Sequence, residues 1–229
     1  MHLSRLAAPK NWPIPRKERK WIARPISGPH GLKRCLPLVL VLKYLLGLAK
    51  TTKEAKKILN DGNIIINKKI IKEHRFPIGI MDVIEIPKLG KSFVMIYDRQ
   101  GNFKLQEIKD TGFKLCKIIG KTMVKHGKLQ LNLHDSRNIL LDKNMYHVGD
   151  TIVFDFNNKK IKDAFELKEG CWIMITDGRY KGYIGKVKQI LHGKYPEKPK
   201  IVFQVNGEEH ITLKDYAFVI GKEKSVLPI

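Results

Sequence analysis

Cationic side chains gather with aromatic rings in the first 34 residues of the chain. This segment holds nine lysine or arginine residues and two tryptophans, and Glu18 is its single acid. Lysine and arginine pair with phosphates, and flat rings stack on unpaired bases, so the combination is typical of contact with nucleic acid. The candidate contact residues are Arg5, Lys10, Trp12, Arg16, Lys17, Arg19, Lys20, Trp21, Arg24, His30, Lys33 and Arg34.

A second cationic group belongs to a helix that is predicted to begin at Thr51. Thr51 and Glu54 have the spacing of a capping box, in which each side chain accepts a backbone N–H of the other residue. Ala55, Ile58 and Leu59 form the inward stripe of this helix. The outward side of the helix and the turn that follows it present the candidate phosphate contacts Thr51, Lys53, Lys56, Lys57, Asn67, Lys68 and Lys69.

A third group lies in a glycine-rich hairpin within residues 167–190. Two predicted strands, 171–176 and 183–190, flank a loop whose glycines allow positive φ and close backbone approach. The hairpin presents the candidate RNA contacts Arg179, Tyr180, Lys181 and Lys186. An ordinary hairpin with solvated lysines is the alternative interpretation.

Patterns typical of catalysis or metal binding do not occur in the sequence. The eight histidines are dispersed, and there is no local signature of a nucleophile with its base or of a phosphate-binding glycine loop. Cys35, Cys116 and Cys171 are far apart, so we interpret them as buried or incidental thiols in a reducing compartment. We predict no enzymatic activity, no cofactor and no metal.

The charge balance points to a polyanionic partner. The 229 residues include 44 Lys+Arg against 22 Asp+Glu, a net charge of +22 that would repel itself without a counter-charge. Hydrophobic residues make up 43% of the chain, which is enough to build folded cores. No apolar run reaches the ~18–20 residues that span a bilayer, so we expect no membrane segment.

Four segments are predicted. Residues 1–34 contain five prolines, which exclude a long helix, so we expect an extended basic arm that becomes ordered against RNA. A disordered solubilising tail is the alternative. Residues 35–86 predict a small α/β domain with an apolar helix from Leu38, the capped helix, and strands at 64–66, 70–71 and 83–86. Residues 87–166 predict a barrel-like β domain, and residues 167–229 a second β module. The expected fold class is therefore α+β with several domains.

Two of these segments resemble known RNA-binding modules. This chain resembles the S4-type RNA-binding domain in residues 48–55, 61–63, 66–69 and 82–86. The hairpin at 167–190 resembles a KOW motif, with Gly182 at the central glycine of that motif. This resemblance implies an SH3-like β-barrel for the last module.

The order of motifs along the whole chain resembles the ribosomal protein S4e family of archaeal and eukaryotic small subunits. The motifs are residues 1–3, 5–9, 28–30, 35–38, 77–83 and 218–222. The resemblance implies a non-catalytic protein that binds and organises small-subunit rRNA of the 16S/18S type. It also implies contact with neighbouring small-subunit proteins and a cytoplasmic location.

Two other functions fit part of this pattern. An RNA-modifying enzyme with an S4 domain would need a separate catalytic domain with an active-site Asp, and a regulator with a KOW motif would not need the basic arm. Eukaryotic members of the resembled family carry a longer extension after the KOW module, so an archaeal source is expected for this chain.

Overall fold

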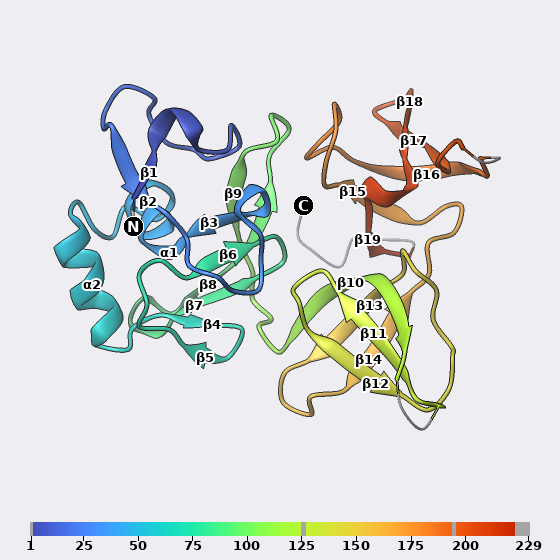
Figure 1. Ribbon diagram of the computed structural model, residues 1–229, viewed down its shortest axis with the longest axis horizontal. Helices are drawn as coiled ribbons and strands as arrows, with labels where there is room; N and C mark the ends of the chain where they lie inside the picture. Colours follow the sequence, from blue (N-terminus) through green and yellow to red (C-terminus); the bar gives the residue numbers. More distant parts are fainter. Residues whose placement is uncertain (1, 125–126, 194–195, 223–229) are drawn as a thin grey trace. The chain divides into compact units, whose positions relative to one another are not determined.

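The computed structural model describes residues 2–124, 127–193 and 196–222. The chain divides into two compact units: residues up to Tyr97 together with Asn102–Lys114, and Asp98–Gly101 together with the chain from Leu115 onward. Strands dominate the described residues, and both α-helices belong to the first unit (Figure 1). The predicted fold class, α+β, is confirmed in so far as the described residues are mostly strands with a few helices.

A five-stranded antiparallel sheet, in the order β5-β4-β7-β8-β9, is the largest element of the first unit. Its strands are β4 (Ile65–Ile66), β5 (Lys69–Ile70), β7 (Val83–Ile86), β8 (Lys91–Tyr97) and β9 (Phe103–Glu107). Ile84 of β7 pairs with Phe93 of β8, so the sheet continues across the boundary predicted between residues 86 and 87. A 3-10 turn, Pro87–Leu89, joins these strands. Proline and glycine occur both in hairpin turns and at domain boundaries, so these residue types do not distinguish the two. For this reason the predicted boundary falls inside the sheet.

The helices of this unit begin where the sequence predicts them. Helix α1 (Leu38–Leu40) continues directly as a π-helical turn, Val41–Leu45, and α2 (Thr52–Asn60) follows. Leu38, Val39, Val41 and Leu42 are buried, as the apolar periodicity indicates.

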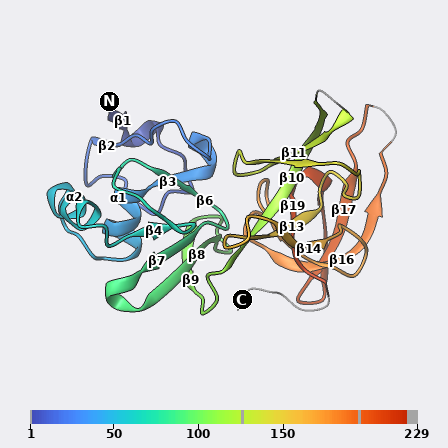
Figure 2. The same ribbon diagram turned by 90° about the horizontal axis from the view of Figure 1, so that it is seen from below.

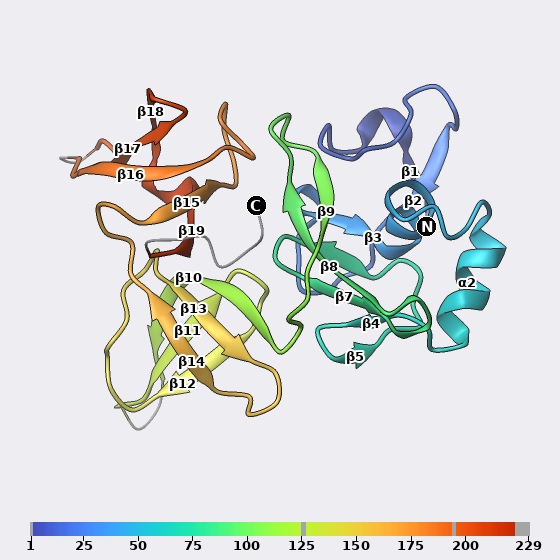
Figure 3. The ribbon, with the colours of Figure 1, turned by 180° about the vertical axis from the view of Figure 1, so that it is seen from behind.

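The first 34 residues are folded into the first unit, which differs from the extended arm expected from their prolines. Strands β1 (His2–Ser4) and β2 (Trp21–Ala23) pair with each other, and β3 (Cys35–Pro37) pairs with β6 (Pro77–Gly79). Trp12, Ile14 and Ile22 are buried, with only 2% of Trp12 exposed. Prolines prevent a long helix but do not prevent irregular backbone from packing on a core. Figure 3 shows β1 and β2 close to the helical elements of this unit.

The second unit contains two five-stranded sheets (Figure 2). The first has the order β12-β11-β10-β13-β14, with β10 (Phe113–Met123), β11 (Leu129–Leu133), β12 (Asn138–Leu141), β13 (Thr151–Asp155) and β14 (Ile161–Phe165). Alternate residues of β11 are buried and join Cys116, Ile118 and Ile152 in its core.

The second sheet of this unit has the order β18-β17-β16-β15-β19. Its strands are β15 (Trp172–Ile175), β16 (Ile184–Leu191), β17 (Lys200–Val205), β18 (Glu208–Leu213) and β19 (Ala217–Gly221). The ammonium group of Lys117 in β10 donates to the backbone carbonyls of Asp215 and Ala217 at 2.7 and 2.6 Å, which ties the two sheets together. Within the described residues, no helix has the length and apolar character that crossing a membrane requires.

Candidate nucleic-acid interface

Helix α2 presents its lysines to solvent because its other side is anchored in the core. Ala55 and Leu59 are fully buried, whereas Lys53, Lys56 and Lys57 are exposed. The capping box is complete: the backbone N–H of Glu54 donates to the Thr51 hydroxyl at 3.2 Å, and the Glu54 carboxylate accepts the backbone N–H of Thr51 at 3.4 Å. Thr51 therefore starts the helix, which is a structural role beside the RNA contact predicted for it.

The Glu54 carboxylate also accepts the backbone N–H of Lys50 at 2.9 Å. This bond, followed by the bonds from Thr51, lowers the pKa of Glu54 and keeps it ionised at the positive end of the helix. Because the Glu54 carboxylate is bonded to backbone N–H groups, it does not neutralise the lysines on the outward side of the helix.

The two tryptophans of the N-terminal segment have different environments. Trp12 is buried in the first unit, so it belongs to the core. The prediction that Trp12 stacks on RNA bases is therefore corrected. Trp21 is 55% exposed, and the ammonium group of Lys20 lies 5.7 Å from the centroid of its ring. Trp21 therefore keeps the geometry of a residue that can stack on a base.

His30 and Asn67, both predicted RNA contacts, are part of a buried network around Asp82. Nε2 of His30 lies 3.0 Å from one carboxylate oxygen of Asp82, and Nδ2 of Asn67 donates to the other at 2.8 Å. The buried Lys114 ammonium group donates to that second oxygen at 2.7 Å. Burial alone would raise the pKa of Asp82, but Lys114 and His30 hold it well below its usual range. The prediction for His30 is corrected because this side chain is buried against Asp82 and faces no solvent.

Most cations of the N-terminal segment remain at the surface. The exposed ones are Lys10, Arg16, Lys17, Arg19, Lys20, Arg24, Lys33 and Arg34. Arg5 is half-buried, and its guanidinium group donates to the backbone carbonyls of Ile14 and Pro15, so it holds this segment in place.

The turn after β4 is fixed by its own contacts. Asn67 and Lys68 have positive φ values of 49° and 63°, and the Lys68 ammonium group donates to Glu85 at 2.9 Å and to Thr111 at 2.8 Å. Lys69, the next residue, is exposed. Of the three predicted contacts in this turn, Lys69 is therefore the one that points to solvent without a structural role in the turn.

The glycine-rich hairpin has the predicted strands, β15 and β16, and a positive φ of 85° at Gly182. Tyr180 stacks on His210 of β18 with ring centroids 4.6 Å apart, and the Arg179 guanidinium lies 5.7 Å from the Tyr180 ring. Tyr180 therefore anchors the loop to the sheet and supports Arg179. Arg179 and Lys186 are exposed, and the stem of Lys181 lies against Gly101.

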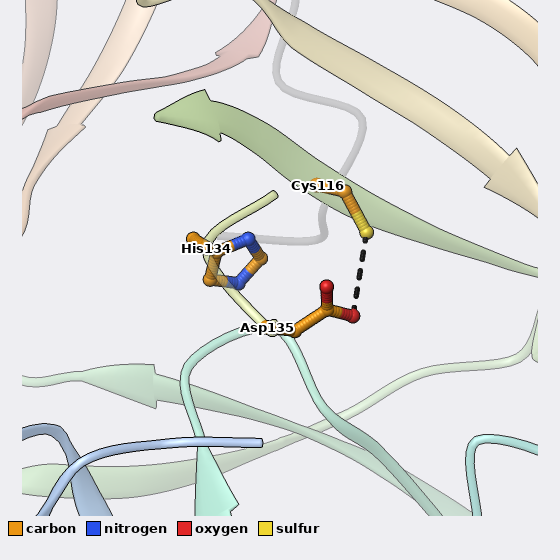
Figure 4. A group of neighbouring side chains, drawn as sticks. All are labelled: Cys116, His134 and Asp135. Carbon is orange, nitrogen blue, oxygen red and sulfur yellow. Dashed lines mark hydrogen bonds between the residues drawn. The ribbon is translucent and has the colours of Figure 1, made fainter. Parts of the chain in front are cut away.

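The structure brings Cys116, His134 and Asp135 together, which sequence spacing did not indicate (Figure 4). The Cys116 thiol lies 3.8 Å from Oδ2 of Asp135, and this carboxylate also pairs with Nε of Arg137 at 3.3 Å. Nδ1 of His134 accepts the backbone N–H of Lys117 at 3.2 Å. Together these bonds hold the turn that follows β11.

The three cysteines are free and buried, in agreement with their interpretation as buried thiols. Burial, with a smaller effect of Asp82, raises the pKa of Cys35 to about 12, and burial also raises the pKa of Cys171. A thiol is a poor nucleophile and a poor metal ligand until it loses its proton.

Sequence reasoning missed a cationic site where the N-terminal segment meets the π-helical turn. Tyr44 donates its hydroxyl to Glu18, and Lys43 lies beside this pair, half-buried. The apolar spacing of residues 38–46 indicated a helix, but only the π-helical geometry and the fold of the N-terminal segment bring these residues together.

Comparisons with known proteins agree with this arrangement. Family models match three stretches: the RS4NT domain over residues 1–33, the S4 domain over residues 36–84, and the ribosomal family S4e over residues 89–161. The RS4NT match covers the N-terminal segment that is folded here, and the S4 match covers the helices and β4 and β5.

Relatives match along the full chain. The small ribosomal subunit protein eS4 of Methanosphaera stadtmanae is 41% identical over 230 residues, covering 100% of this chain and 95% of the relative. That of Archaeoglobus fulgidus is 40% identical over 233 residues, covering 100% and 97%. The crystal structure of the 30S ribosomal protein S4e from Thermoplasma acidophilum is 28% identical and superposes with a TM-score of 0.72, covering 82% of this chain and 96% of that one. The chain belongs to the ribosomal family S4e.

Proposed function

We propose that this chain is a structural constituent of the small ribosomal subunit that binds and organises small-subunit rRNA. The observation that carries the proposal is its full-length similarity to proteins named small ribosomal subunit protein eS4. The exposed cations of α2 and of the N-terminal segment supply the chemistry, because phosphate contacts from lysine and arginine dominate affinity for nucleic acid. Catalysis is not part of this function.

The contacts are divided between the two units. In the first unit, Lys53, Lys56 and Lys57 of α2, the cations of the N-terminal segment and Lys69 bind backbone phosphates, and Trp21 stacks on a base. In the second unit, Arg179 and Lys186 bind RNA beside the glycine-rich hairpin. Support for these roles comes from the exposure of each side chain and from the net charge of +22.

The fold of the second unit is the basis of two finer proposals. The sheet formed by β10 to β14 belongs to a central β-barrel, and the sheet formed by β15 to β19 belongs to an SH3-like β-barrel with a KOW motif. The strand orders and the positive φ of Gly182 support them. We further propose that neighbouring small-subunit proteins are partners and that the protein acts in the cytoplasm.

Sedimentation of native cell extract through a sucrose gradient tests the function. The protein is expected to travel with the small ribosomal subunit at moderate salt and to leave it only at salt concentrations that strip ribosomal proteins. If the protein stays near the top of the gradient at all salt concentrations, it is not a ribosomal constituent.

A further inference from the structure

One acidic side chain lies on the cationic surface of the first unit. The Tyr44 hydroxyl donates to the two carboxylate oxygens of Glu18, at 3.4 Å and 3.2 Å. Nε of Arg19 lies 3.6 Å from the first of these oxygens. Glu18 is the single acid among the first 34 residues, so its contact with these donors does not arise from an excess of acidic residues in the segment.

Lys43 lies beside the Tyr44 side chain that holds this carboxylate, with its ammonium nitrogen 5.6 Å from the centroid of the Tyr44 ring. Burial lowers the pKa of Lys43, and the nearby Arg19 lowers it further, while Glu18 and Glu54 act in the opposite direction. The positive charge of Arg19 thus acts on Lys43, and the negative charge of Glu18 opposes it. Glu54 is committed to the cap of α2, so Glu18 is the carboxylate whose side chain can move away.

The backbone under Lys43 and Tyr44 is unusual. Val41–Leu45 is a π-helical turn, in which the backbone N–H of Leu46 donates to the carbonyl of Val41 at 3.0 Å. Such turns are rare and occur frequently at functional sites, because the extra residue redirects neighbouring side chains. Here the turn presents an ammonium group and a hydroxyl donor to the loop that contains Glu18 and Arg19.

A guanidinium group and a hydroxyl donor on one carboxylate, with an ammonium group beside them, are also the groups that bind a phosphate. We propose that Lys43, Arg19 and the Tyr44 hydroxyl form a subsite for a backbone phosphate of RNA, which Glu18 occupies in the RNA-free protein. This inference rests on the proposed function and extends it to residues at the junction of the N-terminal segment and the S4 domain. RNA binding replaces the Glu18 carboxylate with a phosphate, and Glu18 turns to solvent.

Displacement of Glu18 is physically easy. The side chains of Glu18 and Arg19 are 41% and 52% exposed, and ion pairs at such exposure contribute little to stability. The phosphate arrives on a polymer that is already held by other cations of the protein, so its effective concentration at the subsite is high.

The test compares RNA affinity of variants of the full chain, with a transcript of small-subunit rRNA as the probe. Glu18→Gln is expected to tighten binding about three- to tenfold, and Lys43→Gln to weaken it by a similar factor and to lower the salt slope by about one. In the Glu18→Gln/Lys43→Gln double variant, most of the gain from Glu18→Gln should be lost, because both residues act on one phosphate.

Glu107→Gln and Lys104→Gln are matched controls, since both residues are exposed on β9 and change charge by the same amount. Their effects are expected to stay within about twofold. Lys43→Arg keeps the positive charge and should retain binding, which separates loss of the phosphate contact from damage to the π-helical turn.

Equal effects of Glu18→Gln and Glu107→Gln would overturn the subsite while leaving the proposed function intact. The subsite is also ruled out if the gain from Glu18→Gln persists in full without Lys43. If the unaltered protein does not bind the transcript, the proposed function itself is wrong.

Discussion

Nε2 of His30 lies 3.0 Å from Oδ2 of Asp82, and both side chains are buried although the residues are 52 positions apart in the chain. This contact joins the N-terminal segment to the residue that directly precedes β7. Lys114 reaches the same carboxylate from the start of β10, so one acid holds together three distant parts of the first unit.

We expect Asp82→Asn to destabilise the first unit strongly. The change leaves the Lys114 ammonium group buried without its counter-charge, and breaking a buried ion pair in this way costs about 3–5 kcal/mol. Urea denaturation followed by circular dichroism measures the loss. The exposed Asp142, changed to Asn, is the control and should alter the free energy of unfolding by less than about 0.5 kcal/mol.

The same carboxylate predicts the acid sensitivity of the first unit. The pKa of Asp82 is depressed in the folded state relative to about 3.9 in the unfolded chain, so its stabilisation is present above about pH 4 and is lost as the pH falls through the folded value. The stability of the Asp82→Asn variant should change less over that acidic range. An identical pH profile for the two proteins would contradict this assignment.

Charge reversal at Lys53, Lys56 and Lys57 should weaken RNA binding and leave the fold intact. All three side chains are exposed, so each change should cost no more than about 0.5 kcal/mol of stability. Leu42→Asp is the opposite control, because it places a carboxylate in a fully buried position and should unfold the S4-type fold. Thermal melts beside filter binding decide the matter. An early melt of the lysine variant with a stable Leu42→Asp protein would show that the helix phases are wrong.

Binding to small-subunit RNA should depend steeply on salt. If about 6–10 phosphates are neutralised, affinity falls by about 10³–10⁵ between roughly 50 and 200 mM salt, because bound counterions are released. Titrations of the transcript at several salt concentrations give the slope. A nearly flat dependence would mean that the net charge of +22 does not act through phosphate contacts.

Gly182→Val should damage the glycine-rich hairpin. Gly182 has a φ of 85°, where a β-branched residue is strained, and its backbone N–H donates to the carbonyl of Ile175 at 2.8 Å. We expect a loss of about 1–2 kcal/mol. Gly31→Val is the control, because the space around Gly31 is open and its φ is −69°. Equal melting temperatures of the two variants would show that the loop accepts side chains at Gly182.

Tryptophan fluorescence should separate the two rings of the N-terminal segment. Trp12 is buried, so its emission should be blue-shifted and protected from iodide, whereas the exposed Trp21 should be quenched readily. Addition of RNA should change the emission of Trp21 and leave that of Trp12 almost constant. Single Trp→Phe variants assign these two signals and separate them from that of the third tryptophan, Trp172. If Trp12 is quenched as readily as Trp21 in the free protein, the N-terminal segment is not packed as described.

The sequence by itself determined the local elements of this protein. The Thr51–Glu54 spacing predicted the start of α2, and the apolar run at 83–86 predicted β7 with its bounds. Capping, helical periodicity and strand alternation act between residues a few positions apart, so they can be recognised without a tertiary structure. The net charge likewise indicated a polyanionic partner, and the order of motifs indicated the family, because both are properties of the chain and not of its fold.

Only the tertiary structure decided which candidate contacts reach solvent. Trp12 and Trp21 have the same side chain in the same segment, yet one is buried and the other exposed. His30, Asn67 and Lys114 became partners of Asp82, at separations of 52, 15 and 32 residues. Burial depends on what a distant part of the chain places against a side chain, and no local spacing encodes that. For the same reason, the meeting of Glu18 with Tyr44 could be found only in the folded protein.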